Sequence, residues 1–454
     1  MWEDFLLCCT FFVQLNFPKT DGDHVYSWIF YYVGTKERSQ PLILVEFIFF
    51  VSFLESFILF LYAIRWYIFS FFSLKSKSEC RFESPKNNPV SSFVSVLLPV
   101  YNEQFVVDRL LKACTSFNFS HYEIVVVDDS NDGVTNKKLD VWNDHPKVKV
   151  VHRSSRKGWK GGALNVGLNY LDSRSTHVLV FDADFVPPED LVSRFVSKFN
   201  DENVSVVQGY QKHDLNADEN WITKGVRVWT SLYNMVELNG GQKLGLFSPL
   251  TGCVFMIRTD LLKKLKFEEV TDEDWNLTMR LYENGYKILY DPTLFASGEC
   301  PSTLRRFFKQ QARWAEGHTR TFRSHFLKIW RCKFLKLKEK VDFVFIGASF
   351  LNSILIFLLS LTWIITLLFP TVFFPMPIVN AGLLLLLATI PAGVSASLVA
   401  LSLEGAKKEY RKVGYAWILN FVATPVIAFA AVKGLFTAKG FFHRTPKTGK
   451  ILKE

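Results

Sequence analysis

The stretch Val94-Ser-Val-Leu-Leu-Pro-Val100, followed at once by the polar residues Tyr101-Asn-Glu103, decides the fold. It is a short apolar run rich in β-branched residues, which is typical of a buried strand. The same pattern returns in residues 123–127, 148–151, 177–181 and 204–207. Helix-like segments separate these runs, near residues 103–116, 162–171 and 188–200. Buried strands that alternate with helices predict an α/β domain, a mostly parallel sheet with helices on both faces.

Polar side chains follow three of these strands, at the point where each strand ends. They are Tyr101, Glu103, Asp128, Asp129, Asp182 and Asp184. Because the carboxyl ends of parallel strands meet at one edge of a sheet, we expect these side chains to converge on a ligand. Two carboxylates separated by one residue can bind Mg²⁺ or Mn²⁺, which then bridges to substrate phosphates. Asp182 and Asp184 are the predicted metal ligands; the alternative is a solvated turn in which Asp184 caps a helix.

Two further segments carry charges suited to a phosphate-bearing substrate. In Arg156-Lys-Gly-Trp-Lys160-Gly-Gly the glycines allow close backbone approach and Lys160 supplies a point charge, although a basic turn would look the same. No Walker-type phosphate loop occurs in the sequence, which disfavours a P-loop ATPase. Glu273-Asp274 opens a helix, where acids suit the helix dipole. Asp274 or Asp272 could equally be the base that takes a proton from an attacking hydroxyl.

The composition indicates a membrane protein with a sizeable folded domain. The chain has 454 residues, of which 49% are hydrophobic and 21% charged, and this excludes a disordered, collagen-like or small disulfide-stapled protein. Residues 343–369, 377–403 and 414–432 contain no charged residue and are predicted membrane helices. Residues 42–72 are a fourth candidate. The seven cysteines show no CxxC pair or disulfide spacing, as expected of reduced thiols.

The formal net charge of +10 is concentrated in residues 302–340, directly before the first charge-free stretch. A nucleic-acid binder would spread its basic residues over a folded face, so we expect no nucleic-acid partner. Basic residues beside a membrane helix favour contact with anionic head groups on the cytoplasmic side. Residues 304–330 are a basic amphipathic helix or helix pair. Gln310, Arg313 and Trp314 share one of its faces, which without other motifs would be read as a lipid-anchoring patch.

The charges also predict a topology. Basic residues after the segment 42–72 place the central domain in the cytosol. The helix that begins near residue 343 exits and the next one returns. A full crossing by 414–432 would put the basic tail outside, against the same bias. We therefore predict a re-entrant or interfacial helix broken near Thr424-Pro425, with an external tail as the alternative.

The order of the acidic motifs resembles that of family 2 inverting glycosyltransferases of the cellulose synthase and hyaluronan synthase type. The matching residues are Asp129, Asp182-Ala-Asp184, Glu273-Asp274 and Gln310-Gln-Ala-Arg313-Trp314. The resemblance implies a GT-A-like domain in which Asp129 contacts the nucleotide base, Asp182 and Asp184 serve the donor diphosphate and a metal, and Asp274, with Glu273 beside it, is the base. It also implies that Gln310, Arg313 and Trp314 hold the leaving group and the acceptor end. The full donor set is Tyr101, Glu103, Asp128, Asp129, Lys160, Asp182, Gln310, Arg313 and Trp314.

Two more segments extend the resemblance. Residues 207–216 and 250–258 are similar to the acceptor side of plant glucomannan-synthase-like members, which assigns Thr251 and Gly252, with Trp314, to the acceptor. Phe442-His-Arg-Thr445-Pro-Lys447 resembles the FxVTxK gating-loop motif, with Arg444 in place of Val. A gating role for Thr445 and Lys447 implies a cytosolic tail. The alternative for Lys447 is binding to lipid phosphate.

The family implies transfer of a sugar from a nucleotide-sugar, a UDP-sugar by expectation, to a growing β-linked polysaccharide. Two alternatives remain: a lipid glycosyltransferase acting on a diacylglycerol or polyprenyl acceptor, and a non-catalytic nucleotide-sugar-binding scaffold or transporter. The expected protein is multi-pass, in the plasma membrane or another cellular membrane, contacts lipids and leaves oligomerisation open. Its predicted parts are an amphipathic segment (1–40), a membrane helix (41–73), a cytosolic domain (90–300), interface helices (301–340), membrane or re-entrant helices (341–438) and a cytosolic tail (439–454).

Overall fold

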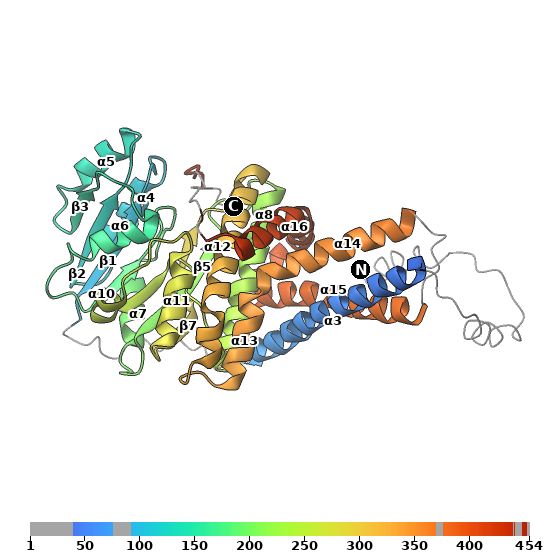
Figure 1. Ribbon diagram of the computed structural model, residues 1–454. Helices are drawn as coiled ribbons and strands as arrows, with labels where there is room; N and C mark the ends of the chain where they lie inside the picture. The colour runs from blue at the N-terminus through green and yellow to red at the C-terminus, as the bar shows by residue number, and fades with distance from the viewer. Residues whose placement is uncertain (1–39, 76–91, 369–375, 439, 441–446, 452–454) are drawn as a thin grey trace, which may run out of the picture.

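The computed structural model describes residues 40–75, 92–368, 376–438, 440 and 447–451 (Figure 1). The predicted amphipathic segment 1–40 and most of the tail motif, including Thr445, lie outside the described residues. A sheet-containing domain forms one end of the molecule, and long helices extend away from it (Figure 1).

The domain is built on a seven-stranded sheet in the order β3-β2-β1-β4-β6-β5-β7. Its strands are β1 Val94–Val100, β2 Tyr122–Asp128, β3 Val148–His152, β4 His177–Val180, β5 Val206–His213, β6 Phe255–Arg258 and β7 Ile288–Gly298. Every paired neighbour is parallel except β6, which runs antiparallel to β4 and β5. The mostly parallel sheet is therefore confirmed. The strands β6 and β7 were not predicted, and β5 extends well beyond the predicted residues 204–207.

Helices cover both faces of the sheet, as the apolar strands predicted. They are α4 Val107–Thr115, α5 Val134–Trp142, α6 Trp159–Gly167, α7 Leu191–Lys198, α10 Thr259–Leu265 and α11 Glu273–Glu283. Alternate residues of β2 enter two separate cores: Ile124 and Val126 pack with α4 and α7, whereas Val125 and Val127 pack with α6 and α11. This two-residue alternation places the strand ends, and the polar residues after them, at an edge between the two helical layers.

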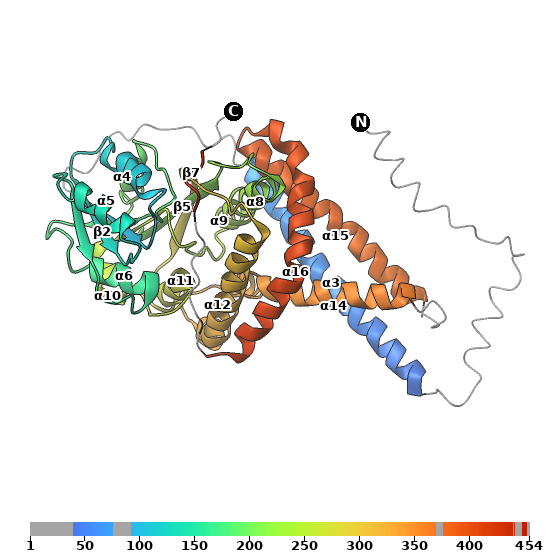
Figure 2. The same ribbon diagram turned by 90° about the horizontal axis from the view of Figure 1, so that it is seen from above.

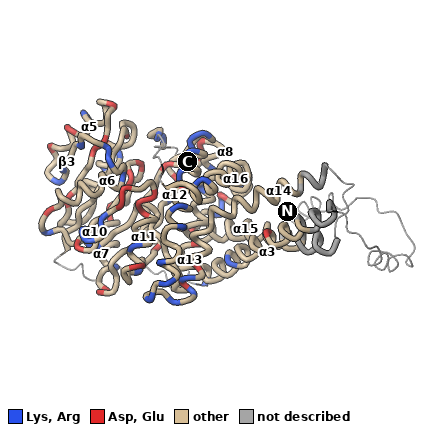
Figure 3. Tube along the Cα trace, in the orientation of Figure 1, with Lys and Arg blue, Asp and Glu red and all other residues tan. Residues whose placement is uncertain are grey.

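The remaining helices join the domain to an apolar bundle. They are α3 Gln40–Lys75, α8 Trp221–Leu232, the π-helix η2 Tyr233–Leu238, α9 Asn239–Lys243, α12 Leu304–Arg331, α13 Leu337–Gly347, η3 Ser349–Leu351, α14 Asn352–Leu368, α15 Met376–Leu403, η4 Lys407–Lys412 and α16 Val413–Phe436. The helices α3, α14 and α15 point away from the domain, whereas α12 and α16 lie side by side at their base (Figures 1 and 2). Charged residues are sparse along α14 and α15 (Figure 3).

By length and composition, two described helices could cross a membrane: Phe50–Lys75 and Lys407–Phe436. A third candidate is the pair Leu337–Gly347 and Ser349–Thr362, which is bent by 42°. The charge-free stretch 343–369 is therefore not one straight helix. Gly347 explains the position of the bend, because a Cβ on it would lie 2.0 Å from Cδ2 of Phe322 on α12. The chain packs tightly on α12 there and turns before α14 begins.

The predicted break in the last apolar segment is wrong. The helix α16 continues through Pro425 from Val413 to Phe436. Both of its ends are held beside the domain: Lys412 forms a 2.9 Å ion pair with Asp218, and Lys433 forms one of 2.9 Å with Glu316 of α12. The helix therefore lies along the junction with the domain, and its interfacial placement stays a prediction (Figure 2).

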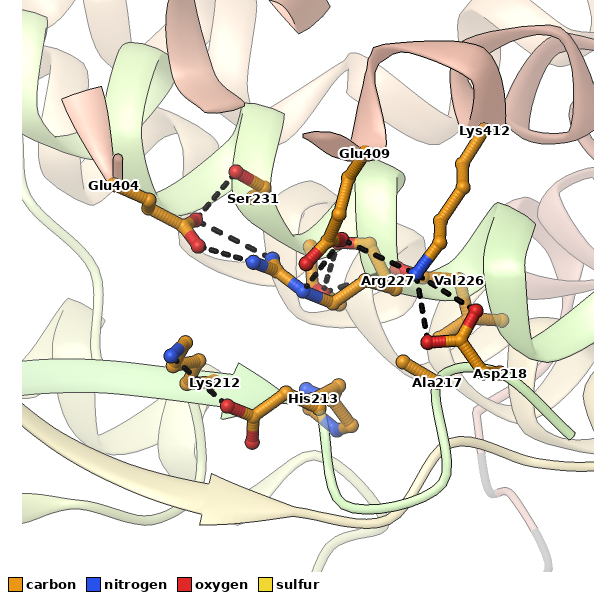
Figure 4. Close-up of polar contacts among 12 residues, drawn as sticks. Lys212, His213, Ala217, Asp218, Val226, Arg227, Ser231, Glu404, Glu409 and Lys412 are labelled. Carbon is orange, nitrogen blue, oxygen red and sulfur yellow. Dashed lines mark hydrogen bonds and ion pairs between the residues drawn. The ribbon is translucent and has the colours of Figure 1, made fainter. Parts of the chain in front are cut away.

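A buried ion cluster fixes the long helices to the domain (Figure 4). Arg227 of α8 is only 1% exposed; it pairs with Glu404, just beyond α15, and approaches Glu409 of η4 at 3.3 Å. The Tyr210 hydroxyl of β5 donates to Glu404 at 2.6 Å. Buried charges are stable only when paired, so this cluster restricts how the helices can sit on the domain. Its members come from distant parts of the sequence and were not predicted.

Candidate active site

A cavity of about 1010 Å³ opens where the carboxyl ends of β1, β2 and β4 meet the helices α11 and α12. Almost all of the predicted site residues line it. They are Tyr101, Glu103, Asp129, Lys160, Asp182, Asp184, Thr251, Gly252, Glu273, Asp274, Gln310, Arg313, Trp314 and Lys447. The sequence expectation that three strand ends deliver polar groups to one site is therefore met.

Asp128 is the exception, and its predicted donor contact is corrected. This carboxylate is 1% exposed and is not among the residues that line the cavity. It accepts hydrogen bonds from the Ser130 backbone at 2.9 Å and from the Asn136 amide at 2.6 Å, and lies 2.8 Å from Nδ1 of His152. Adjacent residues of a strand point in opposite directions, so Asp128 shapes the loop after β2 while Asp129 faces the cavity.

In one corner of the cavity, a cation–π pair of Arg156 and Tyr101 is found with a buried carboxylate oxygen of Asp129. The Arg156 guanidinium lies 3.5 Å from the centroid of the Tyr101 ring. Asp129 is held by Arg153 at 2.9 Å through Oδ2, and burial raises the pKa of Asp129 to about 6 despite that arginine. Within the described part of the chain, Oδ1 of Asp129 has no hydrogen-bond partner. A planar group with N–H donors would fit this corner by stacking and by donating to Asp129.

Lys160 links three parts of the site. Its ammonium lies 2.7 Å from Oδ1 of Asp182 and 3.4 Å from Oε1 of Glu273, and it donates to the Gly252 carbonyl at 2.7 Å. Burial alone would lower the pKa of Lys160, but the charges of Asp182 and Glu273 raise it above its ordinary value. The lysine is therefore a fixed positive charge at the start of α6, where helix N–H groups also favour an anion.

The two predicted metal ligands line the cavity, and each is paired with a lysine. Asp184 Oδ2 lies 2.6 Å from Nζ of Lys447 in the tail. Burial raises the pKa of Asp184, but Lys447 outweighs it and holds that pKa below its usual range. Among the described residues, no group of three His, Cys, Asp or Glu side chains could hold an ion by itself. Two carboxylates nevertheless fit Mg²⁺ or Mn²⁺, because such ions commonly take their other ligands from substrate phosphates and water.

Asp274 lies at the start of α11 and faces Gly252. Burial, together with the neighbouring charge of Glu273, raises the pKa of Asp274 to about 7, although Lys160 opposes the shift. A Cβ at Gly252 would lie 3.1 Å from Oδ2 of Asp274, so the glycine lets the backbone approach the carboxylate closely. A carboxylate poised near neutral pH is suited to accept a proton. Asp272 instead packs on Gly317 of α12.

The basic amphipathic segment is one helix, α12, and the helix pair is excluded. Gln310, Arg313 and Trp314 all line the cavity, as their shared face predicted. Burial lowers the pKa of Arg313, against the opposing charges of Glu273 and Asp274. Gln310 is buried, whereas Trp314 is 39% exposed and covers the rim. These residues approach the acids from the side opposite the sheet.

The structure adds residues that the sequence analysis did not assign. Arg153 and Arg156 hold the corner at Asp129, and Gln211 donates to Oγ1 of Thr251 at 2.8 Å. The cavity also continues between the long helices, where Tyr233 of η2 lines it. Arg156 stood inside the quoted basic segment, but only the fold brings it onto Tyr101.

Comparison with known proteins agrees with this geometry. Residues 95–266 match the model of the glycosyl transferase family 2. The predicted resemblance to family 2 is thus supported over these residues, while the cellulose synthase or hyaluronan synthase type stays a prediction.

Individual relatives and one solved structure are also similar to this chain. The probable glycosyltransferase YdaM of Bacillus subtilis is 27% identical over 54% of this chain and 59% of that protein. Glucomannan 4-beta-mannosyltransferase 2 of Arabidopsis thaliana is 28% identical over 56% of this chain and 49% of that protein. The chain thus spans about half the length of the curated relatives it matches. The mannosyltransferase PcManGT of Pyrobaculum calidifontis, solved with GDP-Man and Mn²⁺, shares the fold: its TM-score is 0.54 at 20% identity, over 85% of this chain and 99% of that one.

Proposed function

We propose that this protein transfers a hexose from a nucleotide-sugar to an acceptor hydroxyl, with inversion at the anomeric carbon, at the cytosolic face of a membrane. The observation that carries the proposal is the single cavity that gathers Asp129, Asp182, Asp184 and Asp274 with Lys160. A nucleotide-sugar has three parts that need recognition, and each has a chemically matched place in this cavity.

The nucleotide base would stack at Tyr101 and Arg156 and donate to the free oxygen of Asp129. The diphosphate would lie near Lys160 and Arg313, two half-buried cations that line the cavity. Preorganised positive charge stabilises a leaving group as it departs, because no solvent has to reorganise during the reaction. Mg²⁺ or Mn²⁺ held by Asp182 and Asp184 would offset further negative charge on that diphosphate.

Asp274 would act as the general base. The acceptor oxygen attacks the anomeric carbon from the face opposite the diphosphate, and its proton passes to the Asp274 carboxylate as the bond forms. The bond from the anomeric carbon to the diphosphate breaks in the same step, and the diphosphate leaves. One displacement of this kind inverts the anomeric centre. The buried position of Asp274 beside Gly252 supports the role.

The names of the glucomannan mannosyltransferase relatives support a mannosyl donor, alongside the UDP-sugar expected from the sequence, and a polysaccharide acceptor. The apolar lower part of the cavity supports the second candidate, a lipid acceptor. We place the catalytic domain and α16 on the cytosolic side of a multi-pass protein, with α3, α14 and α15 in the bilayer.

A donor screen tests the proposal. The full chain in nanodiscs is incubated with UDP-glucose, UDP-N-acetylglucosamine and GDP-mannose, and release of the nucleoside diphosphate is followed with and without Mn²⁺. We expect divalent-dependent turnover of one donor, its abolition in Asp129→Asn, and normal turnover in Asp172→Asn, which changes a remote carboxylate paired with Arg174. Failure of every donor, or full activity in Asp129→Asn, would refute the proposal.

A further inference from the structure

The cavity does not end at the catalytic acids but continues between the long helices. Its far part, here called the lower chamber, is lined by Leu59 of α3, Ile356, Leu359 and Ile364 of α14, Ile390 of α15 and Phe421 of α16. These side chains are aliphatic or aromatic, and a smaller number of polar ones, such as Ser360, Thr389 and Asn420, line the cavity on the same helices. Burying a hydroxyl of a sugar chain against the apolar ones would cost about 1–3 kcal/mol wherever no hydrogen bond replaces the one lost to water.

The lower chamber is also open toward the outer surface of the helices. Ile364 is 52% exposed, Ile390 is 63% exposed and Phe421 is 67% exposed, although all three line the cavity. They come from three different helices, so the apolar surface continues from the interior to the outside between those helices. Only an apolar surrounding such as the bilayer stabilises this exposure, and a hydrocarbon chain could pass sideways from it into the chamber.

A polar cluster, here called the neck, belongs to the wall of the same cavity. Arg65 of α3 and Tyr233 and Glu237 of η2 line the cavity, and Asp342 of α13, which is not among the lining residues, pairs with Arg65. Arg65 forms an ion pair of 3.0 Å with Asp342 and another with Glu237, which also accepts from the indole of Trp66. One guanidinium therefore faces two carboxylates, and the neck has an excess of negative charge.

Tyr233 lines the same cavity as Glu237 and Asp274. Burial raises the pKa of the Tyr233 hydroxyl, so it stays protonated and can donate a hydrogen bond. Tyr233 belongs to a π-helix, a distortion that is frequent at functional sites. The cavity that holds both the lower chamber and Asp274 therefore also offers a phenol hydroxyl and a carboxylate.

We infer that the acceptor is a membrane lipid with a neutral, hydroxyl-bearing head group, whose hydrocarbon chain lies in the lower chamber while its head lies at the neck. The inference rests on the proposed glycosyl transfer and names the acceptor class. The hydroxyl proton goes to Asp274, the oxygen bonds to the anomeric carbon, and the nucleoside diphosphate leaves.

The charges argue against a lipid phosphate as the acceptor. A phosphate head in the cavity would meet the Glu237 carboxylate, and Arg65, the cation that pairs with it, is already shared between Glu237 and Asp342. A phosphate oxygen is moreover ionised near neutral pH and attacks without a base, whereas a neutral hydroxyl needs one. The neck can donate from Tyr233 and accept at Glu237, which suits a glycerol or sugar head.

An acceptor competition tests the inference. Nanodiscs containing the protein and its labelled donor are supplied with diacylglycerol, with undecaprenyl phosphate, or with a soluble β-manno-oligosaccharide. We expect the label to enter the organic phase with diacylglycerol and not with the other two. Labelling of the phosphate lipid or of the soluble glycan in its place would overturn the inference. Absence of donor consumption under every condition would instead count against the proposed function.

Binding can be read without turnover. A diacylglycerol with a diazirine in its acyl chain is photolysed in the nanodisc, and the labelled peptides are identified. Crosslinks at the chamber-lining positions of α14 and α15, competed by unmodified diacylglycerol and not by undecaprenyl phosphate, support the inference even if no donor is found. Crosslinks confined to outward positions such as Leu358 would overturn it.

A matched pair of variants tests whether the hydrocarbon chain of the lipid lies in the lower chamber. Ile356→Trp fills the lower chamber, and we expect the KM for the lipid to rise at least tenfold and the chamber crosslinks to disappear. Leu358→Trp adds the same ring to an exposed position of α14 that is not among the cavity-lining residues, and should behave as the wild type. If Ile356→Trp does not fold, Ser360→Trp, one turn further along the cavity, replaces it. Equal KM values in the pair would overturn the placement.

Discussion

The protonation of Asp274 offers the most direct test of the proposed chemistry. Burial and the adjacent Glu273 raise the pKa of Asp274 to about 7. The ionised carboxylate is the active form, so kcat should rise with pH and reach half its maximum near pH 7. For a single ionisation at that value, about 10% of the sites are active at pH 6 and about 1% at pH 5. An ordinary aspartate would be about nine-tenths ionised at pH 5, so the two cases are easily separated.

The variant Glu273→Gln tests whether the charge of Glu273 contributes to the raised pKa of Asp274. Removing the negative charge beside Asp274 stabilises the ionised carboxylate, so the pKa of Asp274 falls and the acidic limb of the profile moves to lower pH. The loss of the Glu273 contact to Lys160 acts in the same direction, because the ammonium is then left to the remaining acids. Glu269→Gln is the control, since this exposed carboxylate pairs only loosely with Lys157 at 3.9 Å.

The assay is release of nucleoside diphosphate between pH 5 and 9, with donor and acceptor both saturating. Saturation matters because the pKa of Asp129 is raised to about 6, and its titration should appear in the KM for the donor. The assignment of Asp274 as the base would be refuted if the acidic limb of the wild-type kcat–pH profile were centred near pH 4. It would also be refuted if this limb did not move in Glu273→Gln. A limb that moves equally in Glu269→Gln would show a general charge effect.

Three further predictions concern the base, the metal site and the junction. Asp274→Asn should lower kcat by about 10²–10⁴ while leaving the melting temperature within a few degrees, because a positioned base contributes about that factor; an active variant contradicts the mechanism. Lys447→Met frees Asp184 from a charge-assisted hydrogen bond worth about 1.5–3 kcal/mol. The Mn²⁺ affinity of the donor-free protein, titrated by electron paramagnetic resonance, should therefore rise about tenfold or more. Unchanged affinity would show that the lysine does not compete with the metal for Asp184. Arg227→Met leaves buried carboxylates unpaired and should cost about 3–5 kcal/mol of unfolding free energy, whereas Arg174→Met breaks a solvent-exposed pair and should change the unfolding free energy far less. The melting temperatures of the two variants are compared in the same detergent. Equal decreases would contradict the stabilising role given to the Arg227 ion cluster.

Local sequence patterns predicted much of the sheet-containing domain. Apolar runs such as Val94–Val100 form buried strands because their side chains suit a pleated surface covered on both faces. The residue after such a strand must lie at the edge of the sheet, which is why Asp129 and Asp182 could be placed in one site. The face shared by Gln310, Arg313 and Trp314 likewise follows from helical periodicity alone. Weak local signals failed: β6 is only Phe255–Arg258, and its antiparallel pairing depends on neighbours distant in the sequence.

The sequence by itself determined the parallel strands β1 to β4, the apolar helices, and the carboxylates that follow those strands, because each of these follows from periodicity and spacing within a short window. Only the tertiary structure decided that Asp128 turns inward, that α16 lies along the junction without a break, and that Lys447 reaches Asp184. The lower chamber and the neck are tertiary as well. Their walls come from α3, η2, α13, α14, α15 and α16, and no local pattern specifies how helices that far apart along the chain pack against one another.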